Sequence, residues 1–352
     1  MEHFCNGSKS GSVKEATKGL NDPKAIIMLV GSADLFEDAV SDLEDLYPNV
    51  PSVACVASGY SKKYQDGGIF IIAFTSGVDV ASGVIKEVST APIKYIKNMA
   101  DTIASVDPGK DNTVCIDFCT GNDAAVLNTI NMLLQKCGVS LMGGTGDAGK
   151  VACNGRVYED ADAYLIVKNL TGKAIVYKEN VYTPRNELSF IASDTDRSKY
   201  YVGKLNGKSA KQVYMETLGI PESAIATQTF TNPLGKMVGK DVCIISLKEV
   251  SGEGLCCYRQ VNDSDVLTML EIRDYREVAQ DTIDRIKKDF KHISCVFSVN
   301  CAFRYLYFND HDGMDAYLNE MSVLGNHCGY VGYGEHYNNQ FVNQSMSCVV
   351  FE

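Results

Sequence analysis

The pattern of apolar and polar positions repeats three times along the chain. Each repeat predicts an apolar strand, an amphipathic helix, a small-residue strand, a polar turn and another apolar strand. The first repeat covers 25–30, 36–47, 52–59 and 68–74; the second covers 113–118, 124–136, 140–146 and 163–167; the third covers 294–299, 314–321, 328–335 and 348–351. We predict three related units. Strand-helix-strand order is common, so chance similarity of the three segments stays open.

A different section separates the second repeat from the third. It predicts short strands at 172–177, 189–194, 200–206, 241–247 and 255–259, a helix at 209–218 and a longer helix at 275–290. The predicted strands are often apolar at both odd and even positions, which is typical of buried sheets covered by helices. We therefore predict a mixed α/β (α+β) protein. At 352 residues, the chain is expected to form two domains.

Composition excludes several function classes. A net charge of −11 argues against nucleic acid as a partner, because phosphate binding needs clustered Lys and Arg. No apolar run approaches the roughly 18 residues of a membrane span, and the polar residues 1–22 read as a flexible tail. The 13 cysteines are odd in number and include no Cys-x-x-Cys pair. We expect a reduced, cytoplasmic protein without membrane contact, metal or cofactor.

A glycine-rich segment, 144–150, resembles nucleotide-binding loops in its residue identities alone. A dinucleotide fingerprint must open a helix, but residues 151–158 read as a turn and a strand. A phosphate loop needs Ser or Thr after its lysine, and this chain has Val151. We therefore expect the glycines to permit close approach of backbone to a pocket or another strand.

Two clusters carry candidate chemistry. The first holds Cys301 and Arg304, where a buried strand ends and a loop is expected to start. The cation of Arg304 would favour the thiolate of Cys301. A buried cysteine followed by an arginine in a surface ion pair would give the same sequence. The second, 332–344, combines Glu335, His336 and several amide side chains between two apolar strands. Amides suit recognition of a carboxylate or an amino group, although a plain polar hairpin would look similar.

These residues, in this order, resemble the FIST proteins. The N-terminal part is similar in 51–59, in 142–147 and in Asn154-Gly155. The C-terminal part is similar in 205–210 with Val213-Tyr214, in Cys301 with Arg304, in 332–335 and in 343–345. The resemblance implies a FIST N-terminal domain at 23–199 and a FIST C-terminal domain at 200–352, after the tail.

FIST regions are regarded as sensory modules that bind small ligands such as amino acids. The resemblance therefore implies a small polar metabolite as ligand and a separate protein as signalling partner. We expect Arg304 to hold a ligand carboxylate through two prongs, Glu335 to take an ammonium or fix Arg304, and Asn343 to add a neutral contact. Cys301 belongs to the same set. Gly144 and Thr145 occupy the matching place in the second repeat and are expected to line the opposite wall.

Two other function classes stay open. In the first, a thiol enzyme, Cys301 is the nucleophile, His336 the base and Glu335 the group that orients the base. This alternative requires a Cys301 thiol with a lowered pKa. In the second, a protein adaptor binds no ligand and exposes an apolar patch.

Overall fold

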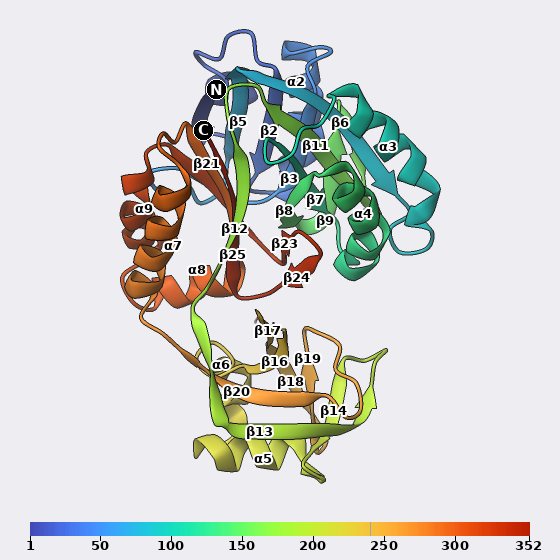
Figure 1. The fold of residues 1–352 in the computed structure, drawn as a ribbon, viewed down its shortest axis with the longest axis vertical. Helices are drawn as coiled ribbons and strands as arrows, with labels where there is room; N and C mark the ends of the chain where they lie inside the picture. The colour runs from blue at the N-terminus through green and yellow to red at the C-terminus, as the bar shows by residue number, and fades with distance from the viewer. Residues whose placement is uncertain (240) are drawn as a thin grey trace. The chain divides into compact units, whose positions relative to one another are not determined.

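The computed structural model describes residues 1–239 and 241–352 (Figure 1). It confirms a mixed α+β chain, which divides into two compact units. The first unit combines Met1–Glu179 with Ala279–Glu352, and the second is Asn180–Val278. This division differs from the one predicted at residues 199 and 200, because the chain returns to the first unit after the second.

In the described part of the chain, no helix has the length and apolar character needed to cross a membrane.

The three predicted repeats are all present in the first unit. The first repeat is β2 (Ala25–Val30), α2 (Phe36–Leu46), β3 (Ser52–Val56) and β5 (Ile69–Ser76). The second repeat is β7 (Thr113–Cys119), α4 (Asp123–Cys137), β8 (Ser140–Thr145) and β11 (Ala161–Asn169). The third repeat is β21 (Cys295–Cys301), α8 (Ala302–Asn309), α9 (Met314–Met321), β22 (His327–Gly332) and β25 (Ser345–Phe351).

Strand pairing is the same in every repeat. The first two strands lie parallel, as a helical crossover requires, and the last strand returns antiparallel on the other side of the first. One topology is therefore used three times, which confirms the repetition read from the hydrophobic pattern. The third repeat departs in one respect from the prediction: α8 begins directly after β21, where a loop was expected.

Each repeat also gives one strand to the sheet of another repeat. β4 (Gly59–Tyr60) leaves the first repeat and pairs with β22 of the third. β9 (Asp147–Cys153) leaves the second and pairs with β3 of the first. β23 (Glu335–Tyr337) leaves the third and pairs with β8 of the second. These exchanges form a closed cycle, so each of the three sheets needs strands from two repeats.

The sheets are completed by strands at their edges. Their orders are β1-β5-β2-β3-β9-β10, β24-β23-β8-β7-β11-β6 and β12-β25-β21-β22-β4. The added strands are β1 (Glu2–Ser8), β6 (Val78–Lys86), β10 (Arg156–Tyr158), β12 (Ala174–Asn180) and β24 (Gln340–Val342).

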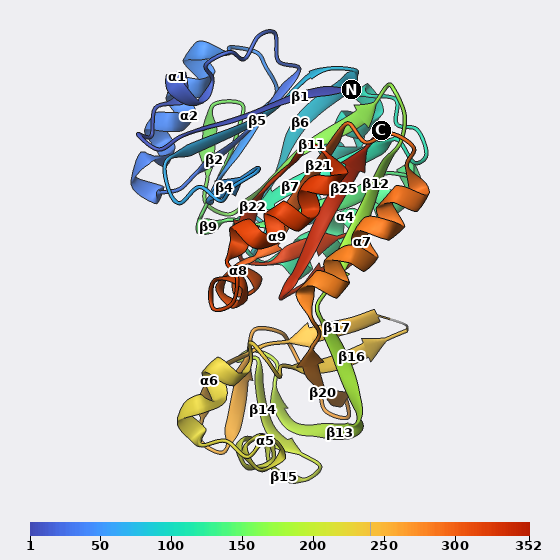
Figure 2. The same ribbon diagram turned by 90° about the vertical axis from the view of Figure 1, so that its left-hand side faces the viewer.

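The inner faces of the three sheets share one apolar core. Ile27 and Phe74 come from the first sheet, Phe118 from the second, and Phe297 and Tyr330 from the third. Helices cover the outer faces: α1 (Val13–Ala16) and α2 lie on the first sheet, and α3 (Ile96–Ser105) and α4 lie on the second. Figure 2 shows α7 (Tyr275–Asp289) and α9 over the third sheet.

The second unit is a separate sheet with its own core. Its strand order is β17-β16-β20-β13-β14-β19-β18, with β15 beside β14. Its elements are β13 (Tyr182–Asp196), β14 (Tyr201–Leu205), β15 (Lys208–Ser209), α5 (Ala210–Leu218), α6 (Ile225–Gln228), β16 (Leu234–Val238), β17 (Asp241–Ile245), β18 (Leu247–Ser251), β19 (Gly254–Cys257) and β20 (Val266–Ile272). Ser209 caps α5 and Gly219 ends it in a left-handed conformation.

The prediction of a flexible tail at residues 1–22 is wrong. β1 pairs with β5 from Glu2 to Ser8, and Val13 and Ala16 of α1 are buried. The segment is polar because it lies at a sheet edge, where backbone hydrogen bonds rather than apolar side chains hold it.

Amide hydrogen exchange tests the assignment of β1. We predict that amides 4–8 exchange on the same time scale as those of β5, because the two strands share one hydrogen-bond ladder. Peptide-resolved exchange with mass spectrometry measures this. Exchange of amides 4–8 at the rate of an unstructured peptide would contradict the pairing.

Candidate functional site

The predicted site residues of the third repeat gather at one end of β21. Cys301 is the last residue of β21, and Arg304 lies in the first turn of α8. Glu335 opens β23, and Asn343 precedes β25. All four are buried, with exposed fractions of 6% or less. The site is therefore an interior polar cluster rather than a set of loop side chains.

Arg304 is already held by a protein carboxylate. Its Nη2 donates to Oε1 of Glu179 at 2.5 Å, and its Nε donates to Oδ1 of Asn300 at 3.1 Å. Its guanidinium also lies over the rings of Phe308 and Tyr317. Burial opposes the charge of Arg304, but Glu179 and Tyr317 outweigh it and raise the pKa. Part of the guanidinium is therefore occupied within the protein, and Nη1 is without a partner among the described residues. A two-pronged contact with a ligand stays a prediction.

A chain of buried hydrogen bonds leads from Arg304 across the third sheet. Asn300, which accepts from Arg304, donates to the hydroxyl of Tyr60 at 2.8 Å. Tyr60 reaches Oγ of Ser298 at 2.8 Å, and Ser298 reaches Nε2 of His327 at 2.7 Å. Tyr60 comes from β4, so the strand exchange between repeats completes this chain.

His327 connects the hydrogen-bond chain to a cavity of about 480 Å³. Burial lowers the pKa of His327 to about 4, so its ring is neutral near pH 7. Its Nδ1 is buried and has no partner among the described residues. The cavity is also lined by Asn319 and by Cys5. A polar path therefore links this cavity to Arg304.

Cys301 and Glu335 form a second group beside Arg304. The thiol contacts the Glu335 carboxylate, which also accepts from the amide and hydroxyl of Ser345 at 3.3 and 3.0 Å. Burial raises the pKa of Glu335 to about 8, although Cys301, Ser345 and the charge of Arg304 each act to lower it. Glu335 therefore holds a proton near neutral pH in the absence of another cation.

Several buried polar atoms in this region lack a hydrogen-bond partner among the described residues. They are Nη1 of Arg304, Oε1 of Glu335, Nδ2 of Asn343 and Oε2 of Glu179. Native interiors satisfy nearly all buried polar groups, and an unsatisfied one points to a missing water, ion or ligand. Arg304 acts electrostatically on both Glu179 and Glu335, and Asn343 lies two residues before Ser345, which bonds Glu335. These residues are therefore a candidate binding site.

Gly144 and Thr145 lie against the same cluster. Gly144 faces Glu335 in the pairing of β8 with β23, and the amide of Thr145 donates to the carbonyl of Gly334 at 2.9 Å. A Cβ atom on Gly144 would lie 2.1 Å from that carbonyl oxygen. This confirms that the glycine permits close backbone approach. No dinucleotide-type helix follows, since the chain continues into β9.

His336 faces away from Cys301 into a different buried group. Its Nδ1 lies 2.5 Å from Oδ2 of Asp117, and its Nε2 lies 2.9 Å from Oδ1 of Asp123. Thr145 donates to the same Asp123 oxygen. Burial disfavours the charge of His336, but Asp117 and Asp123 outweigh it and raise the pKa well above 6.5. His336 is therefore an imidazolium that stabilises buried carboxylates.

The buried acids of this region were not among the residues predicted from the sequence. Asp117 and Asp162 each interrupt an otherwise apolar strand, and both are fully buried. Burial and the charge of Asp117 raise the pKa of Asp162 well above its ordinary value. A charged residue inside an apolar strand run is itself a signal, because a buried carboxylate needs a partner. Glu179 gave no comparable signal, since it lies within a polar run, Lys178-Glu179-Asn180.

The geometry opposes the thiol-enzyme alternative. Cys301 is the N-cap residue of α8, a position that favours thiolate. Burial and the nearby Glu335 nevertheless raise the pKa of Cys301 well above 9.0. Both ring nitrogens of His336 are occupied by carboxylates, so His336 is not poised to accept the thiol proton.

Comparison with known families agrees with this architecture. Residues 24–208 match the FIST N domain, and residues 210–338 match the FIST C domain. The chain belongs to the FIST family. FIST domains are associated with sensory signal transduction and with binding of small ligands. A search of curated proteins finds no match for this FIST protein.

Thiol modification tests the state of Cys301. We predict that brief alkylation of the native FIST protein modifies the partly exposed Cys137 before Cys301, because Cys301 is buried and protonated. Peptide mapping by mass spectrometry gives both rates, and Cys137→Ser confirms the assignment of the faster peptide. Preferential labelling of Cys301 would restore the thiol-enzyme alternative.

The raised pKa of Glu335 predicts a pH-dependent stability difference. The folded protein binds this proton more tightly than the unfolded chain, so the Glu335 contribution is lost as pH rises from about 5 to about 8. We predict that Glu335→Gln gains free energy of unfolding relative to wild type across this window. Urea unfolding measures the difference, with the exposed Glu159→Gln as control. A pH-independent difference for Glu335→Gln would contradict the raised pKa.

Proposed function

We propose that this FIST protein is a sensor that binds an amino acid or a similar small polar metabolite at the cluster of Arg304, Glu335 and Asn343. The observation that carries the proposal is the set of buried polar atoms on these residues and on Glu179 that no described residue satisfies. Family membership supports the same general role.

The unsatisfied atoms match the two ends of an amino acid. Nη1 of Arg304 and Nδ2 of Asn343 are donors that suit a carboxylate. Oε1 of Glu335 and Oε2 of Glu179 are acceptors that suit an ammonium. An ammonium would favour the ionised form of Glu335, so binding releases a proton where Glu335 is protonated in the free protein.

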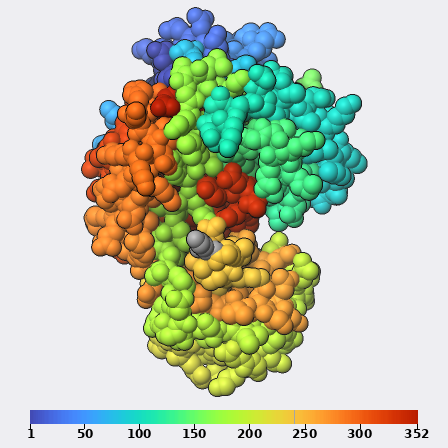
Figure 3. All heavy atoms as spheres, in the orientation of Figure 1, coloured from blue at the N-terminus to red at the C-terminus, as the bar shows by residue number. Residues whose placement is uncertain are grey.

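The hairpin of β23 and β24 provides a route between the buried cluster and the surface. Figure 3 shows this hairpin, in red, at the surface of the first unit between β12 and α4. Lys178 of β12 donates to Gln340 of the hairpin at 2.7 Å. Asn343 follows this hairpin directly, so movement of the hairpin would open the cluster to a ligand and alter the surface that a partner reads.

Signal output through a separate protein belongs to the same proposal. The longest helices in the described ranges, α4 and α7, have 15 residues each. They are short for the coiled coils that transmit signals between domains of one chain. A cytoplasmic location stays a prediction from the cysteine content.

A thermal-melt screen against amino acids and related acids and amines tests the proposal. A ligand at about 100 times its dissociation constant adds about 2.7 kcal/mol, which raises the melting temperature by about 5 °C. We predict that Asn343→Ala abolishes this shift, since it removes a donor that bonds no described residue.

We also predict that the affinity for the ligand rises with pH towards about 8, because ligand and proton compete at Glu335.

The matched control is Asn319→Ala, which lies in the cavity beside His327. Retention of the shift in this variant places the ligand at the Arg304 cluster. Loss of the shift in Asn319→Ala but not in Asn343→Ala would move the ligand to the cavity and contradict the site. A folded protein that responds to no compound would contradict a ligand of this class and favour the adaptor.

A further inference from the structure

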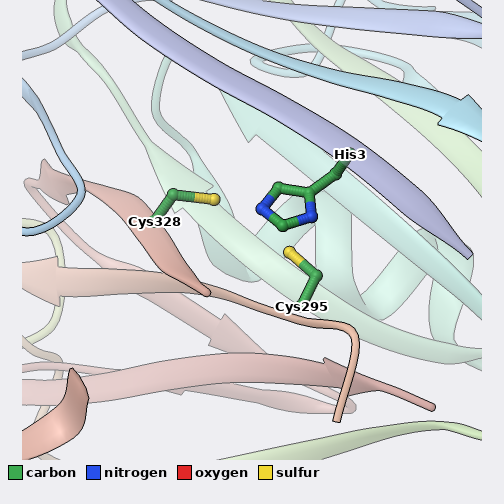
Figure 4. A group of neighbouring side chains, drawn as sticks. All are labelled: His3, Cys295 and Cys328. Atoms are coloured by element: carbon green, nitrogen blue, oxygen red, sulfur yellow. The ribbon is translucent and has the colours of Figure 1, made fainter. Parts of the chain in front are cut away.

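Three potential metal ligands meet where the first and third sheets face each other. They are His3 of β1, Cys295 of β21 and Cys328 of β22, and their ligand atoms all lie within 4.8 Å of one another. Figure 4 shows both thiols pointing toward the imidazole of His3. We propose that this group binds one Zn²⁺ ion, with Cys5 as the fourth ligand.

The ligand chemistry favours zinc. Thiolate and imidazole are the ligands of structural zinc sites, in tetrahedral sets such as Cys3His. Zinc–sulfur bonds of about 2.3 Å place tetrahedral sulfur ligands about 3.8 Å apart. The observed separations of at most 4.8 Å therefore need only small side-chain adjustments to reach that geometry. Carboxylates, which would favour Mg²⁺ or Ca²⁺, are not part of the group.

The fourth ligand comes from the strand that carries His3. Cys5 lies two residues after His3, so both side chains project from the same face of β1. The Cys5 sulfur lies outside the group of atoms within 4.8 Å of one another, so it has to move toward the ion to complete the site. Cys5 also lines the cavity of about 480 Å³, which gives a metal ion access to an otherwise enclosed place.

Burial and charge are compatible with a bound ion. Cys295 and Cys328 are fully buried and belong to the shared apolar core, where an uncompensated charge is costly. Two thiolates neutralise Zn²⁺, and a third adds one negative charge at the cavity side. Binding displaces thiol protons to solvent, one from each coordinating cysteine, so affinity falls as pH falls.

Zinc at this place would tie the N-terminal strand to the third repeat. β1 otherwise contacts its own sheet through pairing with β5. The lack of a Cys-x-x-Cys pair excludes only zinc sites whose cysteines are close along the chain. Here His3 and Cys295 are 292 positions apart, so no spacing pattern reveals the group.

Cobalt substitution in the reduced, full-length protein tests the site. We predict one equivalent of Zn²⁺ in the purified protein by elemental analysis. We predict that Co²⁺ replaces it with the visible bands of tetrahedral coordination and thiolate charge-transfer absorption. His3→Ala, Cys295→Ser and Cys328→Ser should lower Co²⁺ affinity by more than the roughly 10- to 100-fold that loss of an outer-shell partner causes. Cys5→Ala should remove about one third of the charge-transfer intensity.

The matched control is Cys55→Ala, which removes a buried thiol from the same core outside the group. Its spectrum and affinity should equal those of wild type. His3 is only partly buried, so His3→Ala is expected to stay folded even if the buried Cys→Ser variants do not. Folded, reduced wild type without saturable one-equivalent Co²⁺ absorption would overturn the site. A His3→Ala variant with the Co²⁺ spectrum of the wild-type protein would overturn the site as well. A Cys5→Ala variant with unchanged charge-transfer intensity would overturn the assignment of the fourth ligand.

Discussion

The exchange of strands among three repeats is the constraint on which the rest of the first unit depends. β4, β9 and β23 each complete a sheet that begins in another repeat. Backbone hydrogen bonding at these edges fixes where the strands lie, because a buried edge without a partner is costly. The candidate site follows directly: β23 places Glu335 against Gly144, and β4 places Tyr60 against Ser298.

The buried charge of Arg304 is compensated by Glu179. Arg304 and Glu179 are 1% and 2% exposed, and removal of one member of such a pair typically costs about 3–5 kcal/mol. The residues around this pair come from all three repeats, with Tyr60 from the first, Gly144 from the second and Glu335 from the third. The cluster therefore needs all three repeats to be folded. A cluster held in this way keeps its unsatisfied atoms in fixed positions, which is the condition for selective recognition of a small polar molecule.

The sequence predicted the elements of the fold well, because hydrophobic periodicity is local. The three repeats followed from such patterns, and the close approach at Gly144 followed from the glycine-rich segment 144–150. Residues 1–22 were misjudged, since a sheet-edge strand is held by backbone atoms and needs few apolar side chains. The ion pair of Arg304 with Glu179 could not be predicted, because the two residues are distant in sequence. His3 with Cys295 and Cys328 was equally invisible, since it depends on how two sheets face each other.

The central claim is that the buried cluster around Arg304 is completed by a small polar molecule. The most direct measurement is a crystal structure of the protein grown with the ligand that gives the largest thermal shift. We predict density for that molecule in contact with Nη1 of Arg304, Nδ2 of Asn343 and a carboxylate oxygen of Glu335. A closed cluster in which Arg304 and Glu335 bond each other or ordered water, with the ligand elsewhere, would contradict the claim.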